Sequence, residues 1–517
     1  MNYKNTLFKI ICLSFILFQI SCKKENNQKN EEVTAENVNK PASVQIAQTY
    51  QTDEKLSDDE KLEVKSVIHF SAKYNSPAIW NYEKDVTQGA LRKLNPLSNG
   101  NLVFLMEEGD GKYNFSPFVL ILDKNGKEIF KQNIGDKKSK YNFYDPLVQD
   151  NSNGGFTLYV KKEIKSVNES AVSDEAKMRS ALAKYQIEKI TFKNLNSPST
   201  SISRSMEDIF FKTLQEKGFT HLSKSDFSLK SIKNKIWITG TAAKRNESEI
   251  PFIAVLDQNF KLLKFNTYEG YPETDINNIS LNPDNTFYIE GVEDTAADGS
   301  YYSTYKRFII NENLKLLADK SDSKPYSSFY RGPSAPDVEE EEEETVSEET
   351  TSETETNSNT ESEKGNTCHF YSDRVENSYY SIKEKEMNSS EILFEKAKSA
   401  DSTALWQIRF VFPSNYEVPY INSTKGFKRK NGDFVFSLFI RDESVKSGVL
   451  SMVIFIFNKE GRLVSQFQTP AYFGLTDFEM QEVNGKLIAG FISYNADYVN
   501  NNWEYPHVFR SISYPLD

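Results

Sequence analysis

The chain has 517 residues, with 74 acidic and 62 basic side chains and a net charge of −12. Thirteen of the acids lie in one stretch without a base, Asp337–Glu363, so the rest of the chain is nearly neutral. A nearly neutral body without a basic stripe argues against nucleic-acid binding. Three cysteines are too few for a disulfide framework, while 36 Phe and 27 Tyr are typical of a β-rich core.

The first 22 residues have the organisation of an export signal. Lys4 and Lys9 make the start positive, an apolar run covers Ile10–Phe18, and the small residue Ser21 precedes Cys22. The run is about half of the roughly 20 residues needed to span a bilayer. The sequence therefore predicts export and not a membrane-spanning helix.

The segment Gln19-Ile20-Ser21-Cys22 resembles the lipobox of bacterial lipoproteins. The resemblance implies that a signal peptide of residues 1–21 is removed and that Cys22 is acylated, because its thiolate is the nucleophile that accepts a lipid group. Lys23–Glu25 lacks the aspartate that would retain such a protein at the inner membrane. The expected location is the outer membrane, facing the cell surface, with the bilayer as a partner.

Residues 22–65 are rich in Asn, Gln, Glu, Lys and Thr and poor in aromatic side chains. Such a segment cannot bury enough apolar surface to offset the entropy of ordering. We expect a disordered tether between the anchor and the folded body.

A turn of Asn, Asp or Gly followed by an apolar strand recurs along the rest of the chain, which is the signal of a β-hairpin. The strands begin after Gly100, Gly155, Asn234, Asn285, Gly432 and Gly485. A second pattern of strand, tight turn and strand occurs four times, at residues 118–127, 252–261, 308–315 and 453–462. Repeats of roughly 40–50 residues, each a small antiparallel sheet, predict an all-β fold, a β-propeller of about seven blades.

We expect blades in residues 66–336 and 368–517, separated by a disordered acidic loop at 337–367. A helical insertion is predicted at Ser173–Tyr185 and Ser205–Lys217, where Ser205 and Asp208 form a capping pair and Gly218 ends the second helix. The alternative is two β domains divided at the acidic tract.

Ring closure needs a sheet shared by the two ends of the chain, because an open ring leaves unpaired strand edges. Val67–Ala72 is the apolar run nearest the start of the body, and we expect it to pair with Val508–Ser513.

Familiar catalytic motifs are missing from the sequence. It has no serine elbow, phosphate loop or dinucleotide fingerprint, and its four histidines are not paired at zinc-binding spacing. Adjacent Cys368 and His369 point to opposite faces if they lie on a strand. Asp123–Gly126 and Asn458–Gly461 fit hairpin turns and not calcium loops, because the strand resumes at once. No cofactor or metal is expected.

Aromatic residues are candidates for a sugar or peptide contact: Trp80, Tyr82, Trp237, Trp406 and Trp503. Trp237 lies within an apolar strand and is expected in the core, whereas Trp503 follows three asparagines in a predicted loop and is the preferred ligand contact.

The favoured hypothesis is a membrane-tethered binding or scaffold module of the cell envelope, with an envelope protein or a glycan as partner, and not an enzyme. The alternatives are a subunit of an envelope complex and a glycosidase-like hydrolase. A hydrolase would use paired carboxylates in the central channel, and the sequence does not select a pair.

Overall fold

The computed structural model describes residues 49–516, with gaps at 55–64, 72–77, 110–114, 135–139, 152–153, 164–172, 196–198, 223–226, 246, 298–299, 322–325, 328–366, 374–377, 385–390, 399–403, 420–422, 444–448 and 495–506. Cys22, the acidic tract and Trp503 therefore lie outside the described residues. Within the part of the chain that is described, no helix is both long enough and apolar enough to cross a bilayer.

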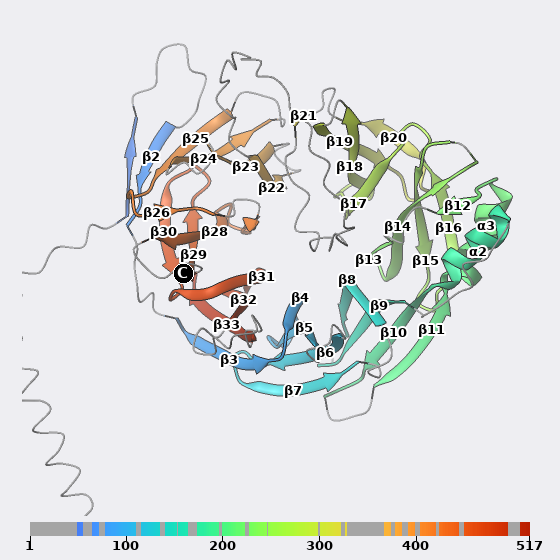
Figure 1. Ribbon diagram of the computed structural model, residues 1–517, viewed down its shortest axis with the longest axis horizontal. Helices are drawn as coiled ribbons and strands as arrows, with labels where there is room; N and C mark the ends of the chain where they lie inside the picture. The colour runs from blue at the N-terminus through green and yellow to red at the C-terminus, as the bar shows by residue number, and fades with distance from the viewer. Residues whose placement is uncertain are drawn as a thin grey trace, which may run out of the picture. The chain divides into compact units, whose positions relative to one another are not determined.

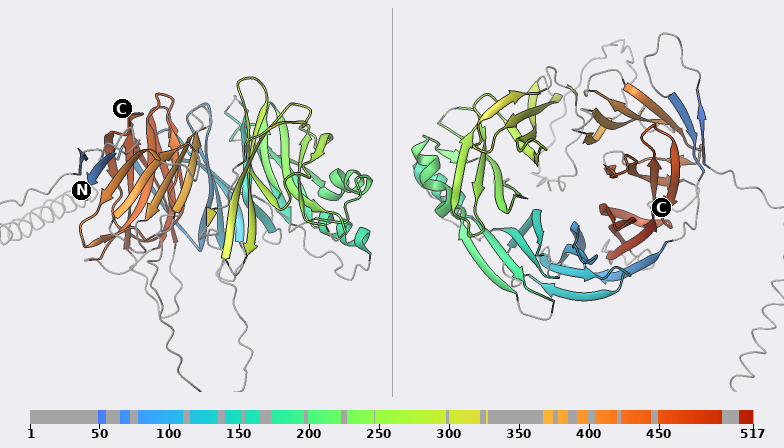
Figure 2. Two further views of the ribbon diagram at one scale, coloured as in Figure 1. Left: turned by 90° about the horizontal axis from the view of Figure 1, so that it is seen from above. Right: turned by 180° about the vertical axis from the view of Figure 1, so that it is seen from behind.

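The described residues form an all-β fold of seven antiparallel blades arranged in a ring, a propeller-like architecture that confirms the prediction (Figures 1 and 2). In each blade the strands are named from the innermost strand outward. Blade 1 contains β4 (Gly89–Pro96), β5 (Leu102–Gly109), β6 (Phe115–Leu122) and β7 (Glu128–Asn133). Blade 2 contains β8 (Lys140–Asp150), β9 (Phe156–Glu163), β10 (Tyr185–Phe192) and β11 (Thr200–Ser205). Blade 3 contains β13 (Ser228–Ile232), β14 (Lys235–Ala243), β15 (Ile250–Leu256) and β16 (Leu262–Thr267), with the short β12 (His221–Leu222) beside β14.

The remaining blades follow in chain order. Blade 4 contains β17 (Thr274–Leu281), β18 (Phe287–Ala297), β19 (Ser300–Ile310) and β20 (Leu316–Asp319), with β21 (Tyr326–Ser327) beside β19. Blade 5 contains β22 (Thr367–Asp373), β23 (Ser378–Glu384), β24 (Glu391–Ala397) and β25 (Ala404–Val411), extended outward by β2 (Lys65–His69) and β1 (Tyr50–Asp53). Blade 6 contains β27 (Gly426–Lys428), β28 (Phe434–Asp442), β29 (Val449–Phe457) and β30 (Leu463–Gln468), with β26 (Tyr416–Glu417) beside β28. Blade 7 contains β31 (Tyr472–Val483), β32 (Lys486–Tyr494), β33 (His507–Pro515) and β3 (Trp80–Val86).

Apolar side chains between neighbouring blades form the core. Separate clusters join blades 1 and 2, 2 and 3, 3 and 4, 5 and 6, 6 and 7, and 7 and 1. Aromatic pairs are prominent: Tyr380 and Phe434 stack with ring centroids 4.2 Å apart, and Phe104 meets Phe509 edge-on at 5.0 Å. Blades 1, 2, 3, 6 and 7 thus pack against a cluster on both faces, which explains their long apolar strands.

The predicted hairpin turns are present. Asp123 Oδ1 accepts hydrogen bonds from the amides of Asn125 (2.8 Å) and Lys127 (3.0 Å), and Gly126 has a φ of 79°. The same geometry recurs at residues 257–261, 311–315 and 458–462. Backbone amides thus hydrogen-bond to the side-chain oxygen that a calcium loop would need as a ligand. The hairpin interpretation explains these turns.

The predicted helices are also confirmed. α2 (Asp174–Ala183) is capped by Ser173, and α3 (Met206–Glu216) is capped by Ser205, whose Oγ accepts from the Asp208 amide at 3.1 Å. Gly218 follows with a φ of 79°. The two helices pack against the cluster between blades 2 and 3, at the outside of the ring (Figure 1).

Ring closure uses a different strand from the one predicted. β3 pairs with β33 over its whole length, from Trp80↔Ser513 to Val86↔His507. The predicted segment, β2, instead pairs in parallel with β25 at the outer side of blade 5. An outer strand with one exposed face suits the alternating burial seen in β3, whereas β2 is buried at its three central residues.

Two further expectations need correction. Residues 50–53, expected in the tether, form β1, which is held by antiparallel pairing with β2 and by stacking of Tyr50 on His69 (4.8 Å). Two separate β domains are excluded, because β3 and β33 come from opposite sides of the acidic tract and share one blade.

Candidate functional site

Two distorted inner strands meet at the junction of blades 7 and 1. β4 has a bulge between Leu91 and Lys93, which contains Arg92, and β31 has a bulge between Thr476 and Glu479, which contains Asp477. Asp477 has a φ of 47°, a backbone conformation that costs a non-glycine residue energy. Strained residues and bulges concentrate at functional sites because they redirect side chains.

Arg92 is fixed by a carboxylate from the neighbouring strand β5. Its Nε and Nη2 lie 2.9 Å and 2.7 Å from Glu107 Oε2. Glu107 is only 6% exposed, so this ion pair is largely shielded from water on the carboxylate side. Charge-assisted hydrogen bonds of this kind hold a guanidinium in one orientation.

Asp477 lies beside the same guanidinium. Its side chain is exposed, yet burial raises the pKa of the carboxyl, while Arg92 and the backbone of Leu91 partly offset that rise. Burial also raises the pKa of Glu107, opposed by Arg92 and reinforced by the charge of Asp477.

His507 and Tyr494 complete the surroundings of this carboxylate pair. His507 Nδ1 lies 2.8 Å from the carbonyl oxygen of Gly89, and burial lowers the pKa of its imidazole. The His507 ring meets Tyr494 edge-on at 4.7 Å. Burial raises the pKa of the Tyr494 hydroxyl, and the charge of Asp477 adds to the rise.

The constellation is suited to proton transfer. It brings an exposed acid with a raised pKa and a second, buried acid under the influence of one fixed cation, and environments of this type are where acid–base groups are found. Lys425, which also acts on Asp477, forms an ion pair with Glu479 at 2.6 Å. In the described residues, no group of three or more His, Cys, Asp or Glu side chains is arranged to hold a metal ion.

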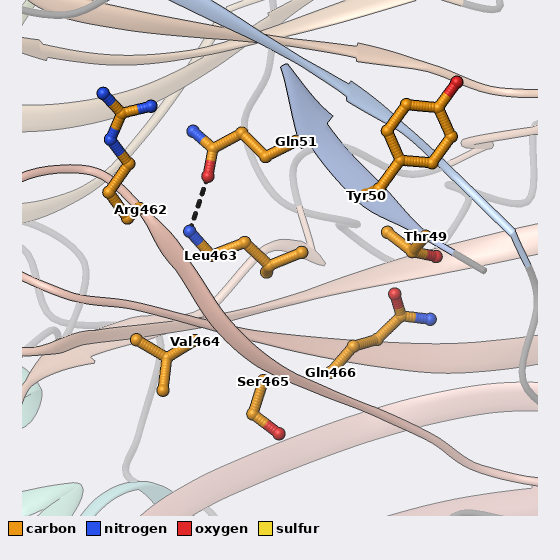
Figure 3. A pocket seen from close by; sticks show the side chains of 8 residues that line it. All are labelled: Thr49, Tyr50, Gln51, Arg462, Leu463, Val464, Ser465 and Gln466. Atoms are coloured by element: carbon orange, nitrogen blue, oxygen red, sulfur yellow. Dashed lines mark hydrogen bonds between the residues drawn. The ribbon is translucent and has the colours of Figure 1, made fainter. Parts of the chain in front are cut away.

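A groove of about 400 Å³ lies between β1 and β30 at the outer side of blades 5 and 6 (Figure 3). Gln51 bridges its walls: Oε1 accepts from the Leu463 amide at 2.6 Å, and Nε2 donates to the Gly461 carbonyl at 2.9 Å. The lining combines polar side chains with Tyr50, Leu463 and Val464, and its charged residue is Arg462. No carboxylate is among the residues that line the groove.

The aromatic candidates differ in how deeply they are buried. Trp237 and Trp406 are each 3% exposed and lie in the core, as predicted for Trp237. Trp80 is half-buried in β3 and covers Gly126 of the next blade. The preferred contact, Trp503, and the acylation site, Cys22, lie outside the described residues. Cys368 and His369 are consecutive residues of β22.

None of Arg92, Glu107, Asp477 and His507 was selected from the sequence as a functional residue. Arg92 and Glu107 lie near the start of the folded body while Asp477 and His507 lie near its end, and each is an ordinary polar residue of a strand. The one sequence signal is local: Glu107 and Glu108 follow a strand of five apolar residues at the end of β5.

No family model matches the chain, and no curated protein matches it. Solved structures do resemble it. The GH93 α-L-arabinofuranosidase of Fusarium graminearum in complex with arabinobiose is 11% identical, with a TM-score of 0.35, covering 69% of this chain and 91% of its own. The α-L-arabinanase of Penicillium chrysogenum is 9% identical, with a TM-score of 0.35 and coverage of 84% and 98%. The sialidase of Trypanosoma rangeli is 9% identical, with a TM-score of 0.37 and coverage of 91% and 57%.

Proposed function

We propose that this chain is an extracytoplasmic hydrolase of glycosidic bonds, with Glu107 and Asp477 as its carboxylate pair. The supporting observation is that these two acids, from different blades, both interact with Arg92, by hydrogen bonds from Glu107 and electrostatically from Asp477, and both have a raised pKa. Glycoside hydrolysis requires two carboxyl groups, one of which carries a proton near neutral pH.

In the proposed reaction, Asp477 is the proton donor because it is the exposed member of the pair. It gives its proton to the glycosidic oxygen as the bond from that oxygen to the anomeric carbon breaks. Glu107, ionised and oriented by Arg92, uses the small part of its side chain that stays exposed to accept a proton from the water whose oxygen bonds to the anomeric carbon. Solvent returns that proton to Asp477, so hydrolysis consumes only water.

The test is hydrolysis by the chain without its signal peptide, measured as reducing ends released from a panel of polysaccharides and as aryl alcohol released from aryl glycosides. Asp477→Asn and Glu107→Gln are each expected to lower kcat by about 100-fold or more. Glu108→Gln is the matched control, since Glu108 is the next residue on β5 and pairs with Lys131 at 3.4 Å. Full activity in Asp477→Asn, or no turnover of any substrate by the unmodified chain, would refute the proposal.

The second candidate function is the binding or scaffold module of the cell envelope that the sequence favours, including a subunit of an envelope complex. The groove of Figure 3 supports it, because Tyr50 and Val464 are exposed there at 52% and 58% beside polar side chains. Affinity purification from native membranes tests this candidate with a Tyr50→Ala, Val464→Ser double variant. A partner that is lost from the variant supports the module, whereas recovery of the chain alone counts against it.

We also propose that the protein is anchored to the outer membrane through an acylated Cys22 and faces the cell surface. The support is the lipobox-like segment Gln19–Cys22 with the charged residues that follow it. Cys22→Ala should move the protein from the membrane fraction to the soluble fraction, and protease added to intact cells should digest the anchored form. A Cys22→Ala protein that stays with membranes would contradict the anchor.

A further inference from the structure

A small cavity of about 40 Å³ lies between blades 3 and 4, where β14 and β15 meet β18. Its apolar lining comes from both blades and its rim is charged. The lining residues are Ile232, Lys233, Lys235, Trp237, Val255, Lys264, Phe287 and Glu312. A cavity of this size admits a water molecule or a small ion but not a sugar ring.

Trp237 supplies a buried hydrogen-bond donor to this region. The indole is 3% exposed and packs against Phe287 with ring centroids 4.3 Å apart. Its Nε1 has no acceptor among the residues that the structure describes. A buried N–H group is costly without a partner, so an acceptor in the adjoining cavity would stabilise the fold.

Lysine side chains surround Trp237 because of strand register. Lys235 lies two residues before Trp237 on β14 and therefore on the same face, while Val255 pairs with Trp237 on one side and with Lys264 on the other. Lys233, in the turn that precedes β14, has its ammonium 6.0 Å from the centre of the Phe287 ring.

The ammonium groups of Lys233 and Lys264 donate their hydrogen bonds to neutral oxygens. Lys233 Nζ donates to Asn285 Oδ1 at 2.7 Å. Lys264 Nζ donates to the Glu312 carbonyl oxygen at 2.6 Å and to Asn313 Oδ1 at 2.9 Å. Lys428, by contrast, lies against a carboxylate, with its Nζ 2.6 Å from Asp373 Oδ2.

We propose that this cavity binds a small anion, chloride or a single carboxylate group, with Trp237 Nε1 and the ammonium of Lys264 as donors. Three lysines against one glutamate leave the rim positive, and a charge-assisted hydrogen bond from a buried N–H favours a compact anionic acceptor. The site is separate from the Glu107 and Asp477 pair and independent of the proposed hydrolase activity.

The test uses the chain without its signal peptide, dialysed into a chloride-free gluconate buffer. Chloride, acetate and phosphate are titrated in turn at constant ionic strength, and binding is followed by calorimetry and by the midpoint of thermal unfolding. Chloride or acetate should bind and raise the midpoint, while phosphate, whose four oxygens exceed the cavity, should bind more weakly.

Trp237→Phe keeps the ring but removes the donor, and it should raise the Kd of the anion by about tenfold or more. Lys264→Met, which removes one charge at the rim, should weaken binding comparably. The matched control is Trp80→Phe, because Nε1 of Trp80 is also buried without a partner among the described residues but has no place in this cavity. Trp80→Phe should leave anion binding unchanged.

Two outcomes would overturn the proposal. One is an unmodified chain that shows no response to any of the three anions at constant ionic strength, which would assign the cavity to water. The other is a response that persists unchanged in both Trp237→Phe and Lys264→Met.

Discussion

Arg307 lies over the ring of Tyr379, with its guanidinium carbon 4.0 Å from the ring centroid. Arg307 belongs to β19 of blade 4 and Tyr379 to β23 of blade 5, and both side chains are buried. The same guanidinium lies 4.8 Å from the ring of Tyr305. In the sequence, blade 4 precedes the acidic tract and blade 5 follows it. This contact therefore joins the blades before the tract to the blades after it.

Arg307→Lys should therefore weaken the junction of blades 4 and 5, because an ammonium cannot stack as a planar guanidinium does. The expected loss in the free energy of unfolding is about 1–2 kcal/mol, measured by denaturant titration. The control is Lys396→Met, which removes a cation 5.7 Å from the Tyr380 ring within blade 5 alone. Hydrogen exchange should rise in β19 and β23 for Arg307→Lys and not for Lys396→Met; equal exchange patterns would contradict the prediction.

Asp477→Asn should raise stability at neutral pH. Because the pKa of Asp477 is raised in the folded chain, the folded state binds more protons than the unfolded state, and stability falls as the pH rises through that interval. The neutral amide removes this penalty, and Asn tolerates a positive φ better than Asp or most residues. Thermal unfolding should show a higher midpoint than the unmodified chain at pH 7 and a smaller difference at pH 3. A difference in unfolding midpoint that grows toward low pH would contradict the raised pKa of Asp477.

Gly126→Ala should cost more stability than Gly461→Ala, although both glycines occupy the same position of equivalent turns. Their φ values are nearly equal, at 79° and 76°. A Cβ on Gly126 would lie 2.5 Å from the Trp80 ring, whereas a Cβ on Gly461 would lie 3.6 Å from the Trp406 ring. Backbone strain of about 1 kcal/mol applies to both, and the clash should add about 1–3 kcal/mol at Gly126 only. Equal losses in chemical denaturation would show that Trp80 moves freely aside.

A chain that begins at residue 78 should keep a closed ring but lose stability, because Ile68 and Phe70 leave the cluster between blades 5 and 6, whereas one that begins at residue 89 should not fold. The first lacks β1 and β2 but keeps β3, which pairs with β33. The second exposes the edge of β33, and unpaired strand edges promote aggregation. Size-exclusion chromatography and circular dichroism distinguish the outcomes, and a soluble, cooperatively unfolding chain from residue 89 would show that blade 7 does not need β3.

The repeating hairpins were predictable because their causes are local. A turn of the type Asp-Lys-Asn-Gly fixes its own geometry through the first side chain and the glycine, as at Asp123 and Gly126. The helix cap at Ser205 is equally local. These signals do not depend on which strands become neighbours.

The closing strand and the carboxylate pair were not predictable for the opposite reason. The choice of β3 and not β2 as the closing strand depends on which face of blade 7 stays exposed to water, and the other strands of that blade lie at the far end of the chain. Asp477 becomes unusual only through its bulge, its positive φ and the approach of Arg92 from another blade. Among 74 acidic residues, nothing in the local sequence distinguishes it.

The position of β1 and β2 has a mechanical consequence if Cys22 is anchored. A pull on the chain from the membrane side reaches β1 first, since β1 precedes β2 and β3 in the sequence. β1 is held by four residue pairs with β2, by stacking of Tyr50 on His69 and by contacts of Gln51 and Asp53 with the neighbouring blade, and this small set of contacts would yield before a whole blade does. The hairpin of β1 and β2 would detach reversibly under tension, before the force reaches β3, the strand that closes the ring.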